Sequence, residues 1–213
     1  MPSAPSPARA TTEQEAFWQG AFGDDYVERN DGADLVASNI ALFVKALSRA
    51  GRIDSLIEFG TNRGLNLIAL RRLLPHCRLA GVEINAKAHA AVSSLGVADV
   101  WRGSVFDYPV TEQFDLALIK GVLIHLAPER LADAYAKLHA ASRRWILLAE
   151  YYNPTPVEID YRGHAGKLFK RDFAGELIDR YPDLRLVDYG FCYHRDPVFP
   201  TGDANWFLLE KQL

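Results

Sequence analysis

The chain has 213 residues, of which 49% are hydrophobic and 24% are charged, a composition typical of one globular domain with a full core. The formal net charge of −3 gives no electrostatic reason to expect nonspecific nucleic-acid binding, and no run approaches the ~20 apolar residues that span a bilayer. We therefore predict a cytoplasmic protein that binds neither nucleic acid nor membranes.

The two cysteines, Cys77 and Cys192, lie far apart in the sequence and lack the spacing of metal ligands. We expect no disulfide framework and no metal site, and a reducing compartment fits this pattern. Residues 1–12 are rich in Pro, Ala and Ser and lack the apolar stretch of a signal peptide, so we predict a disordered tail. Residues 13–213 are assigned to a single domain, in which residues 13–52 form an N-terminal helical cap.

Two helices are predicted at the start of the domain. Residues 11–22 read as a helix capped by Thr11 or Thr12, with acids in its first turn. Residues 34–51 have apolar side chains at helical spacing and end at Gly51, which is typical of a glycine-capped amphipathic helix.

Strand and helix patterns then alternate along the chain. Strands are predicted over 52–60, 78–84, 98–105, 114–121 and 143–152, and helices over 65–74, 85–96 and 127–142. Because the strands are nearly continuous apolar runs, we expect a parallel sheet covered by helices on both faces. The fold class is therefore α/β, with a doubly wound and mostly parallel sheet.

The remaining segments close the domain. Residues 153–169 have no clear regularity, and a helix follows over 170–181. Two last strands, 184–195 and 205–212, are joined by 196–204 and suggest an antiparallel addition to the sheet.

The segment 56–67, LIEFGTNRGLNL, is the strongest functional signal. A buried strand ends on Glu58 and turns at once into a helix through Gly60 and Gly64. In open parallel sheets ligands bind beyond the carboxyl ends of the strands. Gly60 permits a tight turn there, Gly64 lets a ligand approach the backbone, and Glu58 needs a partner such as a ligand ammonium or hydroxyl.

A second acid, Glu83, ends the next strand. An acid in this position accepts hydrogen bonds from ribose hydroxyls. The dinucleotide fingerprint Gly-x-Gly-x-x-Gly is absent, and Glu58 would repel a pyrophosphate. The two acids and the turn therefore predict a pocket for a nucleoside that carries positive charge.

These residues resemble the Glu/Asp-x-Gly-x-Gly-x-Gly turn of class I S-adenosylmethionine (SAM) dependent methyltransferases. Asn62 replaces the middle glycine, but Asn tolerates a left-handed backbone. RGSVFDYP (102–109) and FDLALIKGVLIHLAPERL (114–131) are similar to later segments of that family. The resemblance covers roughly residues 53–150, and it implies a seven-stranded, Rossmann-like sheet in the order 3-2-1-4-5-7-6 with an antiparallel last strand.

The resemblance also implies roles for particular residues. Glu58 is expected near the amino acid part of the cofactor, Glu83 at the ribose, and Ser104 and Val105 at adenine, with Asp107 as a second candidate there. The implied cofactor-binding set is Glu58, Gly60, Thr61, Asn62, Gly64, Glu83, Ser104, Val105, Lys120, Trp18, Tyr26 and Arg29.

A narrower resemblance uses the flanks of the domain. Residues 13–30 and 150–177 look like the methylases associated with pseudaminic acid biosynthesis. This implies a small polar acceptor, either sugar-derived or an amino or carboxy metabolite.

Candidate acceptor-positioning residues follow strands four and five. His125 could serve as a general base or simply pack at a helix start. Tyr151 and Tyr152 stand at the mouth of the crevice or cover the edge of the core. Residues 153–170 are interpreted as a lid or as a surface excursion, and residues 196–206 as a wall of the acceptor site or as a mere connection. Trp18, Tyr26 and Arg29 either close over the cofactor or belong to a helix packed on the sheet.

Two rival functions stay open. A nucleoside-binding module without catalysis would share the pocket, and an NAD(P)-dependent oxidoreductase would share the architecture.

Overall fold

The computed structural model describes residues 9–29 and 32–212. Its helices are α1 (Glu13–Gln19), α2 (Ala21–Arg29), α3 (Ala33–Ala46), α4 (Leu65–Leu73), α5 (Ala86–Ser94), α6 (Leu131–Ala141) and α7 (Phe173–Arg180), with short 3₁₀ turns η1 (Leu123–His125) and η2 (Pro128–Arg130). Its strands are β1 (Ser55–Phe59), β2 (Arg78–Glu83), β3 (Asp99–Arg102), β4 (Phe114–Lys120), β5 (Ser142–Glu150), β6 (Val157–Tyr161), β7 (His164–Lys170), β8 (Leu184–Phe191) and β9 (Asn205–Lys211).

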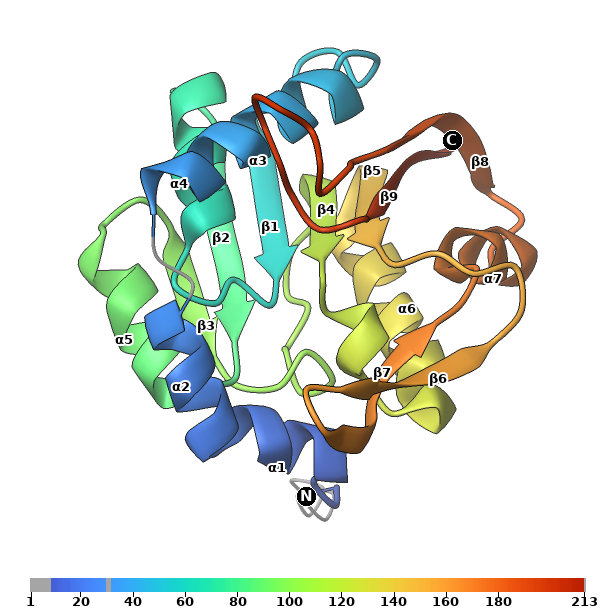
Figure 1. Ribbon diagram of the computed structural model, residues 1–213. Coiled ribbons are helices and arrows are strands. Elements are labelled where there is room, and N and C mark those ends of the chain that lie inside the picture. The colour runs from blue at the N-terminus through green and yellow to red at the C-terminus, as the bar shows by residue number, and fades with distance from the viewer. Residues whose placement is uncertain (1–8, 30–31, 213) are drawn as a thin grey trace, which may run out of the picture.

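A seven-stranded sheet forms the centre of the molecule, in the order β3-β2-β1-β4-β5-β9-β8 (Figure 1). β9 runs antiparallel to both of its neighbours, and the other pairings are parallel. The predicted fold class, strand order and antiparallel last strand are therefore confirmed.

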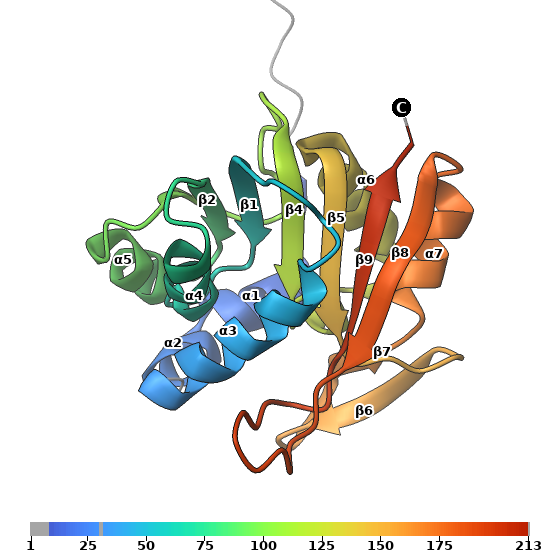
Figure 2. The same cartoon turned by 90° about the horizontal axis from the view of Figure 1, so that it is seen from above.

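Two apolar cores cover the two faces of this sheet. One core joins alternate residues of the strands to α3 and α4, and the other joins the intervening residues to α6 and α7. Figure 2 shows the two groups of helices on opposite faces. All five residues of β1 are buried, which explains why Leu56, Ile57 and Phe59 are apolar on both faces of the strand.

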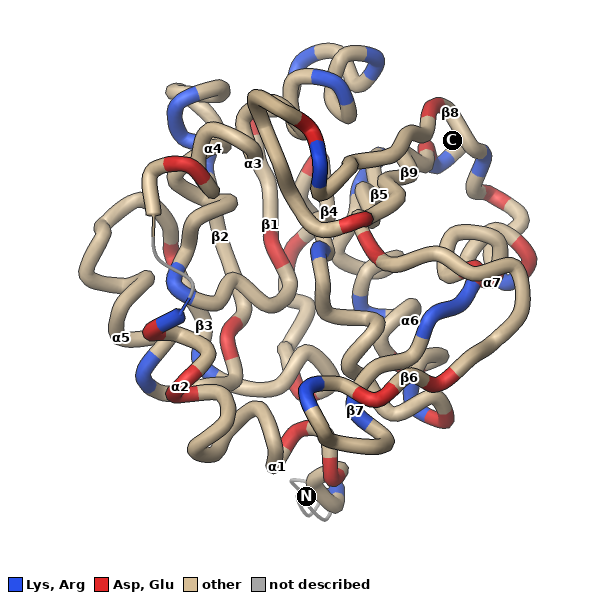
Figure 3. The backbone as a smooth tube through the Cα atoms, in the orientation of Figure 1, with Lys and Arg blue, Asp and Glu red and all other residues tan. Residues whose placement is uncertain are grey.

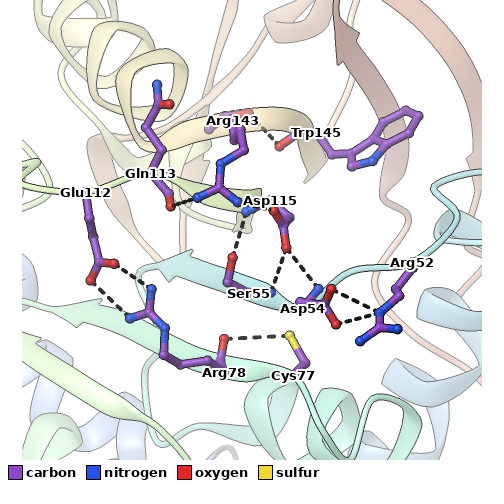
Figure 4. Close-up of polar contacts among 11 residues, drawn as sticks. Arg52, Asp54, Ser55, Cys77, Arg78, Glu112, Gln113, Asp115, Arg143 and Trp145 are labelled. Atoms are coloured by element: carbon purple, nitrogen blue, oxygen red, sulfur yellow. Dashed lines mark hydrogen bonds and ion pairs between the residues drawn. The ribbon is translucent and has the colours of Figure 1, made fainter.

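The amino ends of β1 and β4 are held together by a polar network (Figure 4). Asp115 Oδ2 accepts hydrogen bonds from the backbone N–H groups of Asp54 and Ser55 at 2.9 and 3.0 Å. Ser55 Oγ accepts from the Asp115 N–H at 3.0 Å, and Arg143 donates to Asp115 Oδ1 at 2.6 Å. This network ties the amino ends of β1 and β4 to the start of β5.

The N-terminal segment agrees with the predicted helix and adds a second one. Thr12 caps α1 through a reciprocal pair of hydrogen bonds with Glu15. The sequence analysis did not anticipate α2, which follows after Gly20. Of the predicted disordered tail, residues 1–8 lie outside the described residues, whereas Arg9 contacts Glu15 and Asp107.

The interpretation of 153–169 as irregular is wrong, because this segment forms the two-stranded hairpin β6–β7. Its two-residue turn has a positive φ at both Arg162 (54°) and Gly163 (85°), as a type I′ turn requires. Most of β6 is exposed, so the burial pattern used to recognise the other strands was absent here. The hairpin lies beside α1, with a hydrogen bond from Gln14 to the Gly166 carbonyl at 3.0 Å.

Gly64 tests how tightly the turn between β1 and α4 is packed. Its φ is +85°, and an added Cβ would lie 2.6 Å from Val92 Cγ2. We expect Gly64→Ala to lower the free energy of unfolding by about 3 kcal/mol, through backbone strain and overlap together. Gly96 has a φ of +62°, and a Cβ added there would meet no atom within 4 Å, so Gly96→Ala should lose only about 1 kcal/mol. Urea denaturation measures both, and equal losses would contradict the packing argument.

Candidate functional site

A cavity of about 360 Å³ lies at the carboxyl edge of β1, β2, β4 and β5, within the range of roughly 300–1,000 Å³ that ligand sites occupy. Helices α1, α2 and α3 and the hairpin β6–β7 contribute residues to its walls. The predicted site residues that line it are Trp18, Tyr26, Gly60, Thr61, Asn62, Glu83, Ser104, Val105, Lys120, His125 and Tyr151. Glu58, Gly64, Arg29 and Tyr152 do not line it.

The turn between β1 and α4 contains residues with a left-handed backbone conformation, as its sequence predicts. Asn62 has a φ of 46°, so it replaces a glycine without breaking the turn. The Asn62 N–H donates to Glu83 Oε2 at 2.6 Å. Gly60 and Gly64 serve packing, because an added Cβ would meet Val122 at 2.4 Å and Val92 at 2.6 Å. The expectation that Gly64 gives a ligand access to the backbone is therefore not met in this structure.

Glu83 ties two turns to the end of β2. Its Oε2 accepts from Asn62, and its Oε1 accepts from the Asn85 N–H at 2.7 Å. Burial raises the pKa of this carboxyl, and these backbone hydrogen bonds oppose that effect. Each carboxylate oxygen keeps a second lone pair, so Glu83 can still accept hydrogen bonds from two hydroxyl groups of a ligand.

Glu58 lies behind the cavity wall, fully buried, rather than on the wall. Its Oε1 accepts from the Asn66 side-chain amide at 2.5 Å, and its Oε2 has no partner among the described residues. Burial raises its pKa to about 7. Glu58 therefore makes no direct contact with the cavity, but its hydrogen-bond partner Asn66 lines the wall.

At the β2–β3 end of the cavity, Ser104 and Val105 are both buried and line the wall. Glu15 of α1 lines the same end and is paired with Arg9, whose guanidinium also holds Asp107 at 2.8 Å. Burial raises the pKa of Glu15, but hydrogen bonds from Arg9 and Ser104 outweigh it and bring the pKa to about 2. Asp107 is taken up by this ion pair and does not line the cavity.

An aromatic cluster of α1, η1 and the hairpin forms another wall. The Trp18 ring lies 4.7 Å from the His125 ring and 6.3 Å from the Tyr161 ring, and the His125 and Tyr161 rings lie 4.8 Å apart. His125 Nδ1 lies 2.6 Å from the Lys167 carbonyl oxygen of β7. Because a carbonyl only accepts, Nδ1 carries the proton and Nε2 is the basic nitrogen of this neutral ring.

The other predicted aromatic and basic residues divide between wall and surface. Tyr26 lines the cavity, whereas Arg29 lies over the Phe22 ring at 5.3 Å. Tyr151 lines the cavity, whereas Tyr152 is 39% exposed and lies 6.1 Å from the Phe207 ring.

Several cavity residues were not predicted from the sequence: Ser38, Asn39, Asn66 and Glu150. Glu150 is the last residue of β5, as Glu83 is of β2, and Glu58 is the last but one of β1, so the shared pattern of acids at strand ends was a usable signal. Its Oε1 accepts from the Val122 and Leu123 N–H groups, both at 3.0 Å, and burial raises its pKa to about 7. Thr201, Gly202 and Ala204 also line the cavity, which places part of 196–206 in its wall.

The cavity combines open space with polar side chains from several elements. At Gly121, with a φ of +66°, an added Cβ would meet no atom within 4 Å and would occupy open space. Trp18 Nε1, Asn62 Oδ1, Asn66 Oδ1 and Glu150 Oε2 belong to lining residues and have no partner in the described part of the chain. These atoms are buried, and buried polar atoms in proteins usually have a hydrogen-bond partner.

Comparisons with known proteins give one consistent result. No protein-family model matches the sequence, and no curated protein matches it at the sequence level. Among solved structures, the chain is similar to a Burkholderia thailandensis 1,6-didemethyltoxoflavin-N1-methyltransferase with bound S-adenosylhomocysteine, with 16% identity, a TM-score of 0.71, and coverage of 99% of this chain and 94% of that one.

Two further structures agree. Magnesium protoporphyrin IX methyltransferase from Synechocystis PCC 6803 with bound SAM has 12% identity, a TM-score of 0.67, and coverage of 96% of this chain and 100% of that one. The N-methyltransferase NodS from Bradyrhizobium japonicum with S-adenosylhomocysteine has 15% identity, a TM-score of 0.63, and coverage of 88% and 97%. The chain therefore has the Rossmann-like fold of SAM-dependent methyltransferases.

The state of His125 predicts how stability depends on pH. Burial lowers its pKa to about 4, against the opposing effect of its hydrogen bond to Lys167. In the unfolded chain the histidine pKa is ~6.5, so the unfolded chain takes up a proton at higher pH than the folded protein does. The stability contributed by the neutral buried ring is therefore complete above this pH and is lost as the pH falls toward the pKa of the folded protein. Between pH 7 and pH 4.5, wild type should lose about 2–3 kcal/mol more unfolding free energy than His125→Gln. Urea denaturation at both pH values measures this, and parallel losses would contradict a neutral buried ring.

Proposed function

We propose that this protein transfers a methyl group from SAM to a small polar acceptor. The observation that supports this most directly is the position of Glu83, which ends β2, lines the cavity, and is joined to the β1–α4 turn through Asn62. A carboxylate there suits ribose hydroxyls. The fold shared with methyltransferases that bind SAM or S-adenosylhomocysteine adds to this support.

The lining residues suggest where each part of the cofactor would lie. Glu83 would hold the ribose, and Ser104 and Val105 would border adenine. Gly60, Thr61 and Asn62 would form the bed under the methionine part, with Gly121 giving room beside it. Glu58 would act indirectly, by fixing the side chain of Asn66 in the wall. When bound, the cofactor supplies a sulfonium methyl that is reactive toward a nucleophile.

The chain's own contribution would be alignment of the acceptor and exclusion of water. Trp18, His125 and Tyr161 enclose one side of the cavity, and Tyr151 lies on the wall near Gly202. His125 Nε2 is unprotonated and can accept a hydrogen bond or a proton from an acceptor N–H or O–H group. Tyr152 is a weaker candidate because it is exposed and lies off the wall.

A small acceptor fits the partly enclosed cavity of about 360 Å³. We keep the narrower sequence resemblance, to methylases of pseudaminic acid biosynthesis, as a proposal for its chemistry: a sugar-derived compound or an amino or carboxy metabolite. Within the described residues, no helix is long and apolar enough to cross a bilayer. Cys77 and Cys192 are both free thiols, which is consistent with the proposed cytoplasmic location.

The rival functions meet specific obstacles. The pyrophosphate of NAD(P) would bind at the β1–α4 turn. The acidic Glu58 lies behind the wall there, and the turn lacks the third glycine of the dinucleotide fingerprint. A thermal-shift comparison of NAD, NADP and S-adenosylhomocysteine separates these ligands. A binding module would bind SAM without releasing a methylated product from labelled SAM and cell extract.

Glu83→Ala tests the proposal. We expect the affinity for S-adenosylhomocysteine to fall about 100-fold or more, because two hydrogen bonds to a charged acceptor are lost. Isothermal titration calorimetry measures this, and circular dichroism checks that the fold persists. Glu112→Ala, at an exposed ion pair with Arg78 away from the cavity, is the matched control. Unchanged affinity in Glu83→Ala would count heavily against the proposed site.

A further inference from the structure

The charged side chains on the cavity wall differ in how they are partnered. Five of them are acidic or strongly basic: Glu15, Arg63, Glu83, Lys120 and Glu150. Glu15 is paired with Arg9, and Arg63 donates to the Val27 carbonyl at 3.3 Å. Glu83 and Glu150 accept hydrogen bonds from backbone N–H groups. Only Lys120, within residues 9–29 and 32–212, has no side-chain hydrogen bond and no ion pair.

The Lys120 ammonium is also within reach of a ligand. The residue lines the cavity at the end of β4 and is only partly buried. Unlike Glu58 Oε2 and Glu150 Oε2, its Nζ is not closed off from solvent. Three N–H donors therefore face the cavity without a protein acceptor.

The alternation of β-strand side chains places Lys120 on a defined face of the sheet. Leu116 and Leu118 of β4 pack in the core with α3 and α4, so Lys120 points to that same face. Leu56 of β1 belongs to this core too, which puts Glu58 beside Lys120. Figure 3 shows charged residues near the carboxyl ends of β1 and β4, whereas most of each strand is uncharged.

The opposite face carries the other acid. Ile146 and Leu148 belong to the core with α6 and α7, so Glu150 points toward η1 and its backbone N–H groups. Ser38 and Asn39 of α3 and Asn66 of α4 line the cavity on the Lys120 face. Lys120 is thus surrounded by polar groups that can complete the binding of a small anion.

Glu58 does not satisfy Lys120. Its Oε1 accepts from Asn66 and its Oε2 is closed off without a partner, and neither oxygen accepts a hydrogen bond from Lys120. Burial lowers the pKa of Lys120, and the nearby Glu58 opposes this. Burial also raises the pKa of Glu58 to about 7, which weakens it as a counter-ion near neutral pH. A partly buried ammonium without a hydrogen-bond acceptor is costly, and a bound anion removes that cost.

We propose that Lys120 is a carboxylate-binding residue, whose ammonium donates hydrogen bonds to a carboxylate of a ligand in the cavity. A single ammonium flanked by Glu58 and Glu150 suits a singly charged carboxylate better than a phosphate dianion. The inference rests on the proposed function. The carboxylate belongs either to the methionine part of the cofactor or to the acceptor, and the experiment separates the two.

The first arm compares two nucleosides by calorimetry. S-adenosylhomocysteine has the amino acid carboxylate, and 5′-methylthioadenosine lacks the whole amino acid part. If the carboxylate is the cofactor's, Lys120→Met should lower the affinity for S-adenosylhomocysteine about 10- to 100-fold, as expected for loss of a hydrogen bond to a charged group. Methylthioadenosine should bind as in wild type, which also shows that the cavity is intact. Lys120→Gln is a second variant should Lys120→Met fold poorly.

Lys87→Met is the matched control, since Lys87 is paired with Glu28 and does not line the cavity. It removes the same formal charge and should leave both affinities unchanged. If Lys120→Met lowered the affinity for both nucleosides equally, the inference would be overturned, because methylthioadenosine has no carboxylate to contact.

The second arm uses protein saturated with S-adenosylhomocysteine, with acetate as the probe and methylammonium as its control. If the carboxylate is the acceptor's, acetate should raise the Tm of wild type but not of Lys120→Met, and the nucleoside affinity should be the same in both. If Lys120→Met alters neither the nucleoside affinity nor the acetate response, the inference is overturned. A wild-type protein that binds neither nucleoside overturns the proposed function itself, a result distinct from any effect of Lys120→Met.

Discussion

The site depends on one kind of interaction: a buried carboxylate at the end of a strand that accepts hydrogen bonds from the turn beside it. Glu83 joins the turns after β1 and β2, and Glu150 holds the chain after β4 against the end of β5. Glu58 holds α4 through Asn66. A buried carboxylate without such partners would be very unfavourable, so the turns are fixed where the acids need them.

This constraint also explains why the turn residues look as they do. Asn62 takes a left-handed backbone because its N–H must reach Glu83. Gly60 and Gly64 are glycines because Val122 and Val92 pack where their Cβ atoms would be. The glycines therefore secure the packing that places Asn62, and the cavity wall follows from that packing.

The polar groups at the two edges of the sheet have different roles. At the amino edge, Asp115 binds Ser55 and Arg143 and so joins β1, β4 and β5, which favours stability (Figure 4). At the carboxyl edge, α1 and the hairpin β6–β7 close over the strand ends and are joined to each other by Glu13 and Lys167. His125 binds the same hairpin strand through the Lys167 carbonyl. The wall nearest the proposed acceptor is therefore built from segments far apart in the sequence.

The sequence by itself determined the layered α/β fold and the side of the site that we propose for the cofactor. Largely apolar strands, helical periodicity and acids at strand ends are local patterns, so Glu83 and Asn62 could be predicted to lie on one edge. The tertiary structure decided the rest. The hairpin was missed because β6 is exposed and leaves no burial pattern, and Ser38 and Asn39 became wall residues only through packing. Whether a residue at a strand end faces the cavity, as Lys120 does, or lies behind it, as Glu58 does, depends on neighbours such as Asn66 that no local pattern encodes.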